Sequence, residues 1–190
     1  MKLSAMLIAS VLALFPATAA LAGTARAELG EPLAVGIDVG TTASSAVMGA
    51  VAGSVCFELP LAHPLSLTFE PSAYWSSGTG VSILQLTLVA MMRFYPVALF
   101  VSEGQAHWGP FVAAGAAVAW AHEQSDASLD VVSFGPDVEA GYRLVFGDRG
   151  IFVEPSFGWT ALYGGRFDSS GASATMNSGF SIGFILGYRF

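Results

Sequence analysis

Nine charged residues occupy alternating positions in segments whose intervening positions are mostly apolar, and this spacing gathers their side chains on one face. They are Asp38, Glu58, Glu70, Arg93, Asp137, Glu139, Arg143, Glu154 and Arg189. Carboxylates and guanidinium groups that are enclosed together must pair, because a buried charge without a partner is costly. We therefore expect an ion-paired, hydrogen-bonded plug. A narrow polar pathway or a ligand pocket is the alternative.

Small residues at equivalent alternating positions bear on that alternative, because missing side-chain volume could leave a cavity. They form two groups: Ala46, Ala50, Ala52 and Ser54 in one segment, and Ala113, Gly115, Ala117 and Ala119 in another. Large residues at other positions of the same face could equally fill the space, namely Tyr74, Met91, Phe111 and Phe152.

Cofactor and metal chemistry has little support in the sequence. It contains no Gly-rich phosphate loop and no cluster with metal-ligand spacing, and Asp126 with Asp130 is a weak calcium signal. The single cysteine, Cys56, excludes an internal disulfide framework and a multi-cysteine metal site. We expect no cofactor and no catalytic residues.

The composition indicates a surface that does not face water throughout. Of the 190 residues, 54% are hydrophobic and only 11% are charged, whereas ordinary soluble domains carry about 25% charged residues. The net charge of −7 argues against nucleic acid as a partner.

The N-terminus has the pattern of a secretory signal peptide. Lys2 precedes an almost wholly apolar run over 3–15, and small residues follow. We predict a signal peptide over 1–22, with cleavage after Ala22, or after Ala27 as the alternative. An uncleaved helical anchor is a further alternative.

Two architectures can span a lipid bilayer, helices and closed β-barrels. A spanning helix needs about 20 apolar residues and a spanning strand about 9 to 11. The best helical candidate, 81–101, contains Gln85, Arg93 and Pro96. By contrast, 180–190 alternates between apolar or aromatic residues and mostly small or polar ones, as a transmembrane strand does.

The same alternation predicts eight strands, separated by turn signals. We expect them at 33–40, 46–59, 65–75, 84–94, 110–121, 132–146, 151–163 and 180–190. The prediction is an all-β, eight-stranded, antiparallel up-and-down transmembrane barrel over 33–190. If Phe146 pairs with Ile151, then Arg143 lies opposite Glu154, and such a pair is favourable by roughly 0.2–1 kcal/mol. An even number of strands places both termini on the periplasmic side of such a barrel. The longest connection, 96–109, would lie on that side too, where short turns are usual.

The last residues, Phe184-Ile185-Leu186-Gly187-Tyr188-Arg189-Phe190, resemble the C-terminal signal by which outer-membrane barrels are recognised for assembly. With the other features, the chain resembles the small eight-stranded outer-membrane proteins of the OmpA-barrel, OmpX and OmpW group. The resemblance implies that Leu186, Tyr188 and Phe190 contact the barrel-assembly machinery. It also implies outer-membrane lipid as a partner and the bacterial outer membrane as the location.

The function expected from these features is that of a non-enzymatic outer-membrane barrel, which is structural or allows slow passage or binding of a small solute. Adhesion to a host or partner through 122–130 and 164–176 is the first alternative. A lipid-modifying enzyme is the second. One deacylase type among such barrels uses a His-x-Ser pair, but His122 is followed by Glu123, Gln124 and Ser125.

Overall fold

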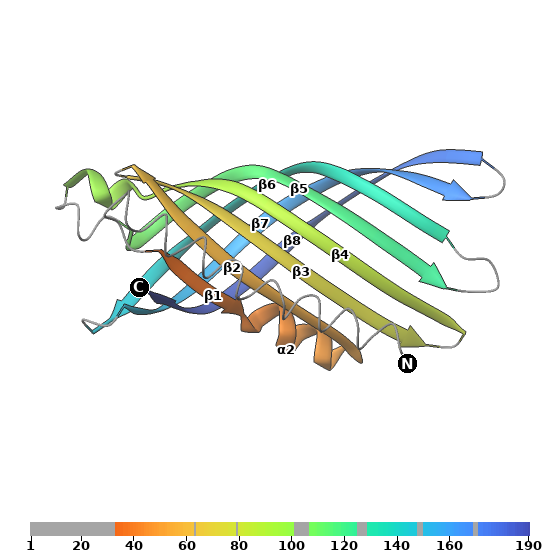
Figure 1. The fold of residues 1–190 in the computed structure, drawn as a ribbon, viewed down its shortest axis with the longest axis horizontal. Coiled ribbons are helices and arrows are strands. Elements are labelled where there is room, and N and C mark those ends of the chain that lie inside the picture. Colours follow the sequence, from red (N-terminus) through yellow and green to blue (C-terminus); the bar gives the residue numbers. More distant parts are fainter. Residues whose placement is uncertain are drawn as a thin grey trace.

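The computed structural model describes residues 33–62, 64–78, 80–100, 107–124, 129–147, 150–168 and 171–190. The predicted signal peptide and its cleavage sites lie outside these residues. The described chain forms a closed antiparallel barrel in which each strand pairs with its sequence neighbours and the first strand pairs with the last (Figure 1). The strands are β1 (Ala34–Asp38), β2 (Ala50–Ala62), β3 (Leu65–Gly78), β4 (Val81–Phe94), β5 (Gly109–Gln124), β6 (Leu129–Phe146), β7 (Ile151–Asp168) and β8 (Gly171–Arg189).

The predicted alternation of faces is present in the structure. On β6, Phe134, Leu144 and Phe146 are exposed on the outer wall, whereas Asp137 and Arg143 are buried in the lumen. The predicted register is also confirmed, because Phe146 pairs with Ile151. On β6, a period of two therefore directs large apolar side chains outward and charged ones inward.

Close strand approach explains one of the glycines inside the wall. A Cβ atom at Gly115 would lie 1.9 Å from the carbonyl oxygen of Ala90 on the adjacent strand. No side chain fits there, so β4 and β5 can keep this spacing only with glycine at position 115.

The N-terminal strand differs from the prediction. β1 ends at Asp38 and not at position 40, and the chain continues as helix α2 (Val39–Val47), so β2 begins at Ala50 and not at position 46. Asp38 accounts for the change locally. Its carboxylate accepts hydrogen bonds from the backbone N–H groups of Gly40 (2.9 Å) and Thr41 (3.2 Å), as a helix N-cap does.

The opposite end of the barrel also differs. The segment 164–176, predicted to be an outer loop, is mostly strand, because β7 and β8 remain paired as far as Asp168 and Gly171. β6 begins at Leu129, so the predicted loop 122–130 is shorter as well. Strands β3 to β8 are 14 to 19 residues long, longer than the roughly 9–11 residues needed to cross a bilayer.

The first residues of the connection between β4 and β5 pack against the inside of one end of the barrel. The connection begins with a 3-10 helix, η1 (Pro96–Phe100), at the end where the C-terminus lies (Figure 1). Tyr95 and Ala98 are fully buried and form an apolar cluster with Phe111 of β5. None of the described helices is long and apolar enough to cross a membrane, a result that does not bear on spanning by strands.

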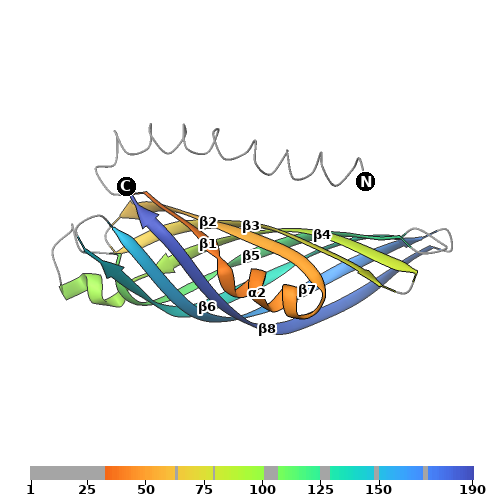
Figure 2. The same cartoon turned by 90° about the horizontal axis from the view of Figure 1, so that it is seen from below.

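Because β1 is so short, the wall has a seam on one side. β1 pairs with β2 only at 55–58 and with β8 only at 185–189. Beyond these pairs, α2 contacts both β2 and β8, and Figure 2 shows it at the end of β1. The barrel is closed by strand pairing at one level and covered by a helix at the next.

Candidate functional site

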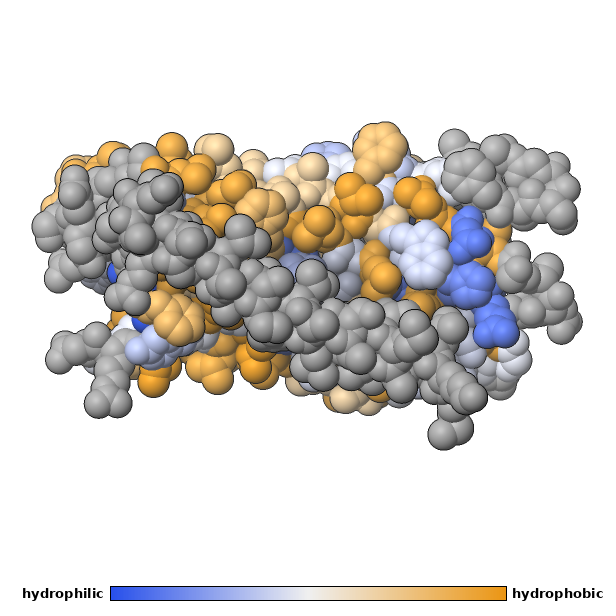
Figure 3. Space-filling model, viewed as in Figure 1, coloured by the Kyte–Doolittle hydropathy of each residue, from blue (hydrophilic) through white to orange (hydrophobic). Residues whose placement is uncertain are grey.

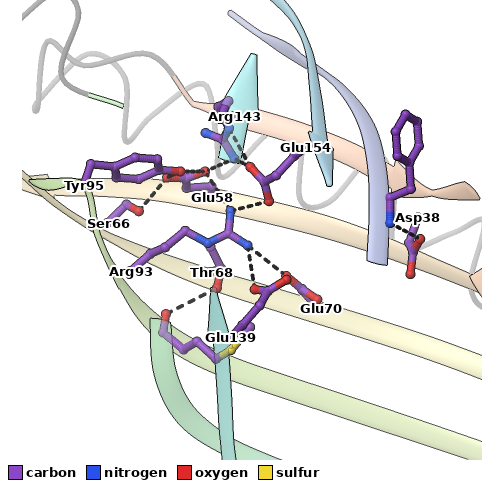
Figure 4. A network of polar contacts seen from close by, with 12 residues as sticks. Asp38, Glu58, Ser66, Thr68, Glu70, Arg93, Tyr95, Glu139, Arg143 and Glu154 are labelled. Atoms are coloured by element: carbon purple, nitrogen blue, oxygen red, sulfur yellow. Dashed lines mark hydrogen bonds and ion pairs between the residues drawn. The ribbon is translucent and has the colours of Figure 1, made fainter. Parts of the chain in front are cut away.

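Arg93 lies at the centre of the lumen and is fully buried. Its Nη1 atom is 2.8 Å from Glu154 and 3.6 Å from Glu58, and its Nη2 atom is 3.1 Å from Glu139 and 3.4 Å from Glu70 (Figure 4). One guanidinium group on β4 thereby joins carboxylates from β2, β3, β6 and β7. It ties opposite sides of the barrel together.

Strand register explains how Arg93 reaches across the wall. It lies opposite Ala113 of β5, which in turn lies opposite Glu139 of β6. The methyl group of Ala113 leaves space in this row, and the long arginine side chain extends through it to the carboxylate. Ala113, one of the small inward residues of β5, therefore leaves room for the ion pair of Arg93 and Glu139.

Arg143 of β6 forms the second centre. Its Nε and Nη2 atoms lie 2.7 Å and 2.6 Å from Oε2 of Glu154, and Nη2 is 2.5 Å from Glu58. The predicted cross-strand pair of Arg143 and Glu154 is therefore observed. Both carboxylates also contact Arg93, so the two arginines belong to one network. We call Glu58, Glu70, Arg93, Glu139, Arg143 and Glu154 the lumenal cluster.

Aromatic rings pack against both guanidinium groups. The Cζ atom of Arg93 lies 4.2 Å from the ring centroid of Phe111, and that of Arg143 lies 4.2 Å from the ring centroid of Phe152. A cation over a ring face is attracted by the ring's quadrupole. The two large inward phenylalanines thus exclude water from the cluster and also stabilise its charge.

Glu58 receives further hydrogen bonds from two hydroxyl groups. Ser66 donates to Oε1 at 2.5 Å, and Tyr95 donates to Oε1 at 3.0 Å. Tyr95 follows the last residue of β4, and burial raises the pKa of its hydroxyl well above the usual value. The hydroxyl therefore stays protonated and acts as a donor. This bond attaches the start of the connection between β4 and β5 to the lumenal cluster.

A cavity of about 210 Å³ adjoins the cluster on the side away from η1. Glu70 and Glu139 form its boundary with the cluster, and Asp137 contributes a third carboxylate that accepts a hydrogen bond from Thr160. Its other polar lining includes Asp38, Thr41 and serine hydroxyls of four strands: Ser54, Ser72, Ser156 and Ser181. The cavity offers hydrogen-bond acceptors and hydroxyls to a small polar molecule.

The remaining predicted interior residues lie outside the lumenal cluster. Asp38 lines the cavity at the seam, where it also accepts a hydrogen bond from the Phe184 N–H at 3.1 Å. Arg189 is half-buried at the end of β8, opposite Ala34 of β1. Of the small residues, Ala50, Ala52, Ala113, Ala117 and Ala119 are buried as predicted, whereas Ala46 lies in α2 and is exposed.

Sequence reasoning missed Tyr95, because the prediction ended this strand at 94. The signal was present in the parity of the positions. Tyr95 continues the inward series of Met91 and Arg93 by one further step of two. An inward aromatic residue directly after a strand that carries a buried arginine is a reason to extend the inward face.

The two histidines among the described residues lie away from the lumenal cluster or at its margin. His122 Nδ1 is 3.0 Å from Asp130, and its ring stacks on Trp120 near the hairpin end of β5. His107 is buried edge-on against Tyr95. His63, the third histidine, and Asp126 of the weak calcium signal lie outside the described residues. Within the described parts of the chain, no three His, Cys, Asp or Glu side chains gather in a way that could hold a metal ion.

Comparison with known proteins gives no match: no protein-family model fits the chain, and no curated protein is similar to it.

Proposed function

We propose that this protein is a non-enzymatic β-barrel of the bacterial outer membrane, with a plugged lumen that binds a small polar solute and passes it only slowly. The observation that carries the proposal is the inside-out distribution of polarity. Arg93 and Glu154 are fully buried in the lumen, while Phe134, Phe157 and Phe180 are exposed on the outer wall. A protein surrounded by water has no reason to expose so many large apolar side chains together.

The outer surface supports placement in lipid. In Figure 3, apolar side chains cover much of the visible wall. Hydrophilic ones gather toward the end where β3 joins β4, β5 joins β6 and β7 joins β8, which we call the hairpin end. Aromatic side chains lie exposed toward both ends of the wall: Trp75 and Tyr163 toward the hairpins, and Phe146, Tyr188 and Phe190 toward the C-terminus. Rings at two levels are typical of the two interfaces of a membrane. Leu186, Tyr188 and Phe190 also face outward, where lipid and the assembly machinery could contact them.

The lumenal cluster argues against an open pore. Its side chains pack with Phe111 and Phe152 inside the lumen. Tyr95 and η1 lie between the cluster and the end of the barrel that carries the C-terminus. The cavity lies on the other side of the cluster, so a solute entering from the hairpin end meets the ion pairs before it can cross. Binding in the cavity is therefore favoured over rapid passage.

The first test is the gel mobility of the full-length protein from the outer-membrane fraction, with and without boiling in SDS. A closed barrel resists SDS until it is heated, so we expect two bands of different mobility. Recovery from the inner membrane or from soluble fractions, with no mobility shift, would reject the proposed location.

The second test is conductance in a planar bilayer. We expect no steady current above the lipid baseline, because the lumenal cluster closes the barrel. A steady open-channel current would reject the plugged lumen and leave the location unaffected.

A further inference from the structure

The seam beside β1 leaves two strand edges without strand partners. β2 extends from Ala50 to Ser54 beyond its pairing with β1, and β8 extends past Phe184 toward the hairpin end. Phe180 and Ile182 of β8 are 89% and 84% exposed, among the highest values for large apolar side chains. Unpaired backbone groups at such an edge are costly in lipid. The seam in its present form is therefore unfavourable in a membrane.

The segment that covers the seam is a weak helix. α2 has nine residues and contains glycine, valine and several hydroxyl residues, none of which favours a helix. Only Ser45 of α2 is buried, and Val47 is 89% exposed. Short helices are marginal without tertiary packing, so α2 depends on the Asp38 cap and on its contacts with β2 and β8.

The register of β1 fits a different arrangement of the same residues. Ile37 pairs with Val55, and Asp38 pairs with Ile185. If the strand continued without a shift, Thr42 would lie opposite Ala50 on one side and Ser181 on the other. This extension would pair the free end of β2 up to its first residue and leave 43–49 as an ordinary loop.

The side chains also suit an extended strand. Alternation would point Val39 outward with Ile37, and Gly40 and Thr42 inward with Asp38. The inward positions lead into the cavity, which is already lined by serine and threonine hydroxyls. Asp38 already accepts the hydrogen bond of the Phe184 N–H that a neighbouring strand would otherwise accept.

We propose that residues 39–42 alternate between the first turn of α2 and a continuation of β1. The continuation of β1 closes a side entrance to the lumenal cavity, and the return to α2 opens it. Asp38 and Thr41 at the seam, and Ser181, Ile182 and Gly183 of β8, line that cavity, so the opening would lead from the membrane directly into it. The proposal rests on the proposed function only in placing the seam in lipid.

Disulfide crosslinking of the full chain in phospholipid vesicles tests the extended state. In a Cys56→Ser background, Thr42→Cys is combined with Ala50→Cys. In the helical state Thr42 is not paired with β2, because β1 pairs with β2 only from Ala34 to Ile37, and a disulfide needs a Cα separation of roughly 4.4–6.8 Å. The extended state brings them face to face.

Ser44→Cys with Ala50→Cys is the matched control, because position 44 is nearer to Ala50 along the chain but lies outside the extension. We expect the pair at positions 42 and 50 to oxidise at least tenfold faster than the control, as measured by loss of free thiols. Equal or slower oxidation would overturn the proposal, since random collisions within a loose loop would favour the control.

Access to the cavity tests the entrance itself. Ser72 lines the cavity, and Ser72→Cys can report on it by its rate of reaction with a membrane-partitioning maleimide. We expect the oxidised bond between positions 42 and 50 to slow this reaction at least tenfold relative to an oxidised Ile37→Cys/Val55→Cys bond. Equal rates would overturn the side entrance. Failure of the protein to fractionate with the outer membrane would instead reject the proposed function and leave both crosslinking results valid.

Discussion

At the scale of single residues, Arg143 stabilises the barrel by neutralising two buried carboxylates. Replacing it with alanine leaves Glu58 and Glu154 without their closest cation, and we expect a loss of about 3–5 kcal/mol in the free energy of unfolding. Urea titration of the protein in vesicles, followed by tryptophan fluorescence, measures this loss. Arg189→Ala is the matched control, because Arg189 is half-buried at the barrel end, and it should cost clearly less.

A second substitution separates an uncompensated charge from lost packing. In the Arg143→Ala background, Glu154→Gln removes a carboxylate that contacts Arg143 at 2.6 Å. We expect the double variant to be more stable than the sum of the single losses allows, since a neutral amide is less costly to bury than an unpaired charge. Simple additivity would mean that the two residues do not act as a pair.

The hydroxyl of Tyr95 has a smaller, separable role. Tyr95→Phe keeps the ring against Phe111 and His107 but removes the donor to Glu58. A hydrogen bond to a charged group contributes about 1.5–3 kcal/mol, so we expect a loss in that range by the same urea titration. Substitutions at the surface usually change stability by no more than about 0.5 kcal/mol. A loss smaller than this would show that the hydroxyl does not hold the connection to the cluster.

At the scale of the elements, Gly115 sets the spacing of β4 and β5. Gly115→Ala forces a methyl group against the Ala90 carbonyl oxygen, and overpacking of this kind costs about 1–3 kcal/mol. Gly179→Ala in β8 is the matched control, because nothing lies within 4 Å of the Cβ position there. Equal urea midpoints for the two variants would contradict the close approach.

The elements also show which parts of the fold were predictable. The faces of β4, β6 and β7 follow from a period of two, which needs only local sequence, and the register at Phe146 and Ile151 follows from a short turn. The length of the β7–β8 hairpin does not, because Ser, Gly and Ala residues that favour turns also pair when a neighbouring strand holds them. α2 was missed because its residues have little helix propensity, although Asp38 is a local N-cap signal, bonded to the N–H groups of Gly40 and Thr41, that the prediction did not use.

The candidate site was also predictable only in part from the sequence. Alternation placed Glu70, Arg93, Glu139, Arg143 and Glu154 on the inward face. The pair of Arg143 and Glu154 follows from the register of one hairpin. Only the closed barrel brings Arg93 to Glu154, since these two residues come from strands that are not neighbours. The contacts of Arg93 with four carboxylates depend on the barrel's curvature and on the small side chain of Ala113, and neither is a property of one segment.

At the scale of the whole molecule, the environment of the outer wall can be tested with one charge. Phe157, in the middle of the wall-forming part of β7, is 65% exposed. If the wall faces lipid, Phe157→Arg should reduce stability in vesicles by about 2–4 kcal/mol, the cost of arginine near the bilayer midplane. If the wall faces water, an exposed substitution should change stability by no more than about 0.5 kcal/mol. Ser77→Arg, at the exposed hairpin end of β3, is the control, and a loss equal to that of Phe157→Arg would contradict a membrane-embedded belt. Because both positions are exposed in the barrel, the difference between the two urea titrations depends on the surrounding medium, and a large difference would require lipid around β7.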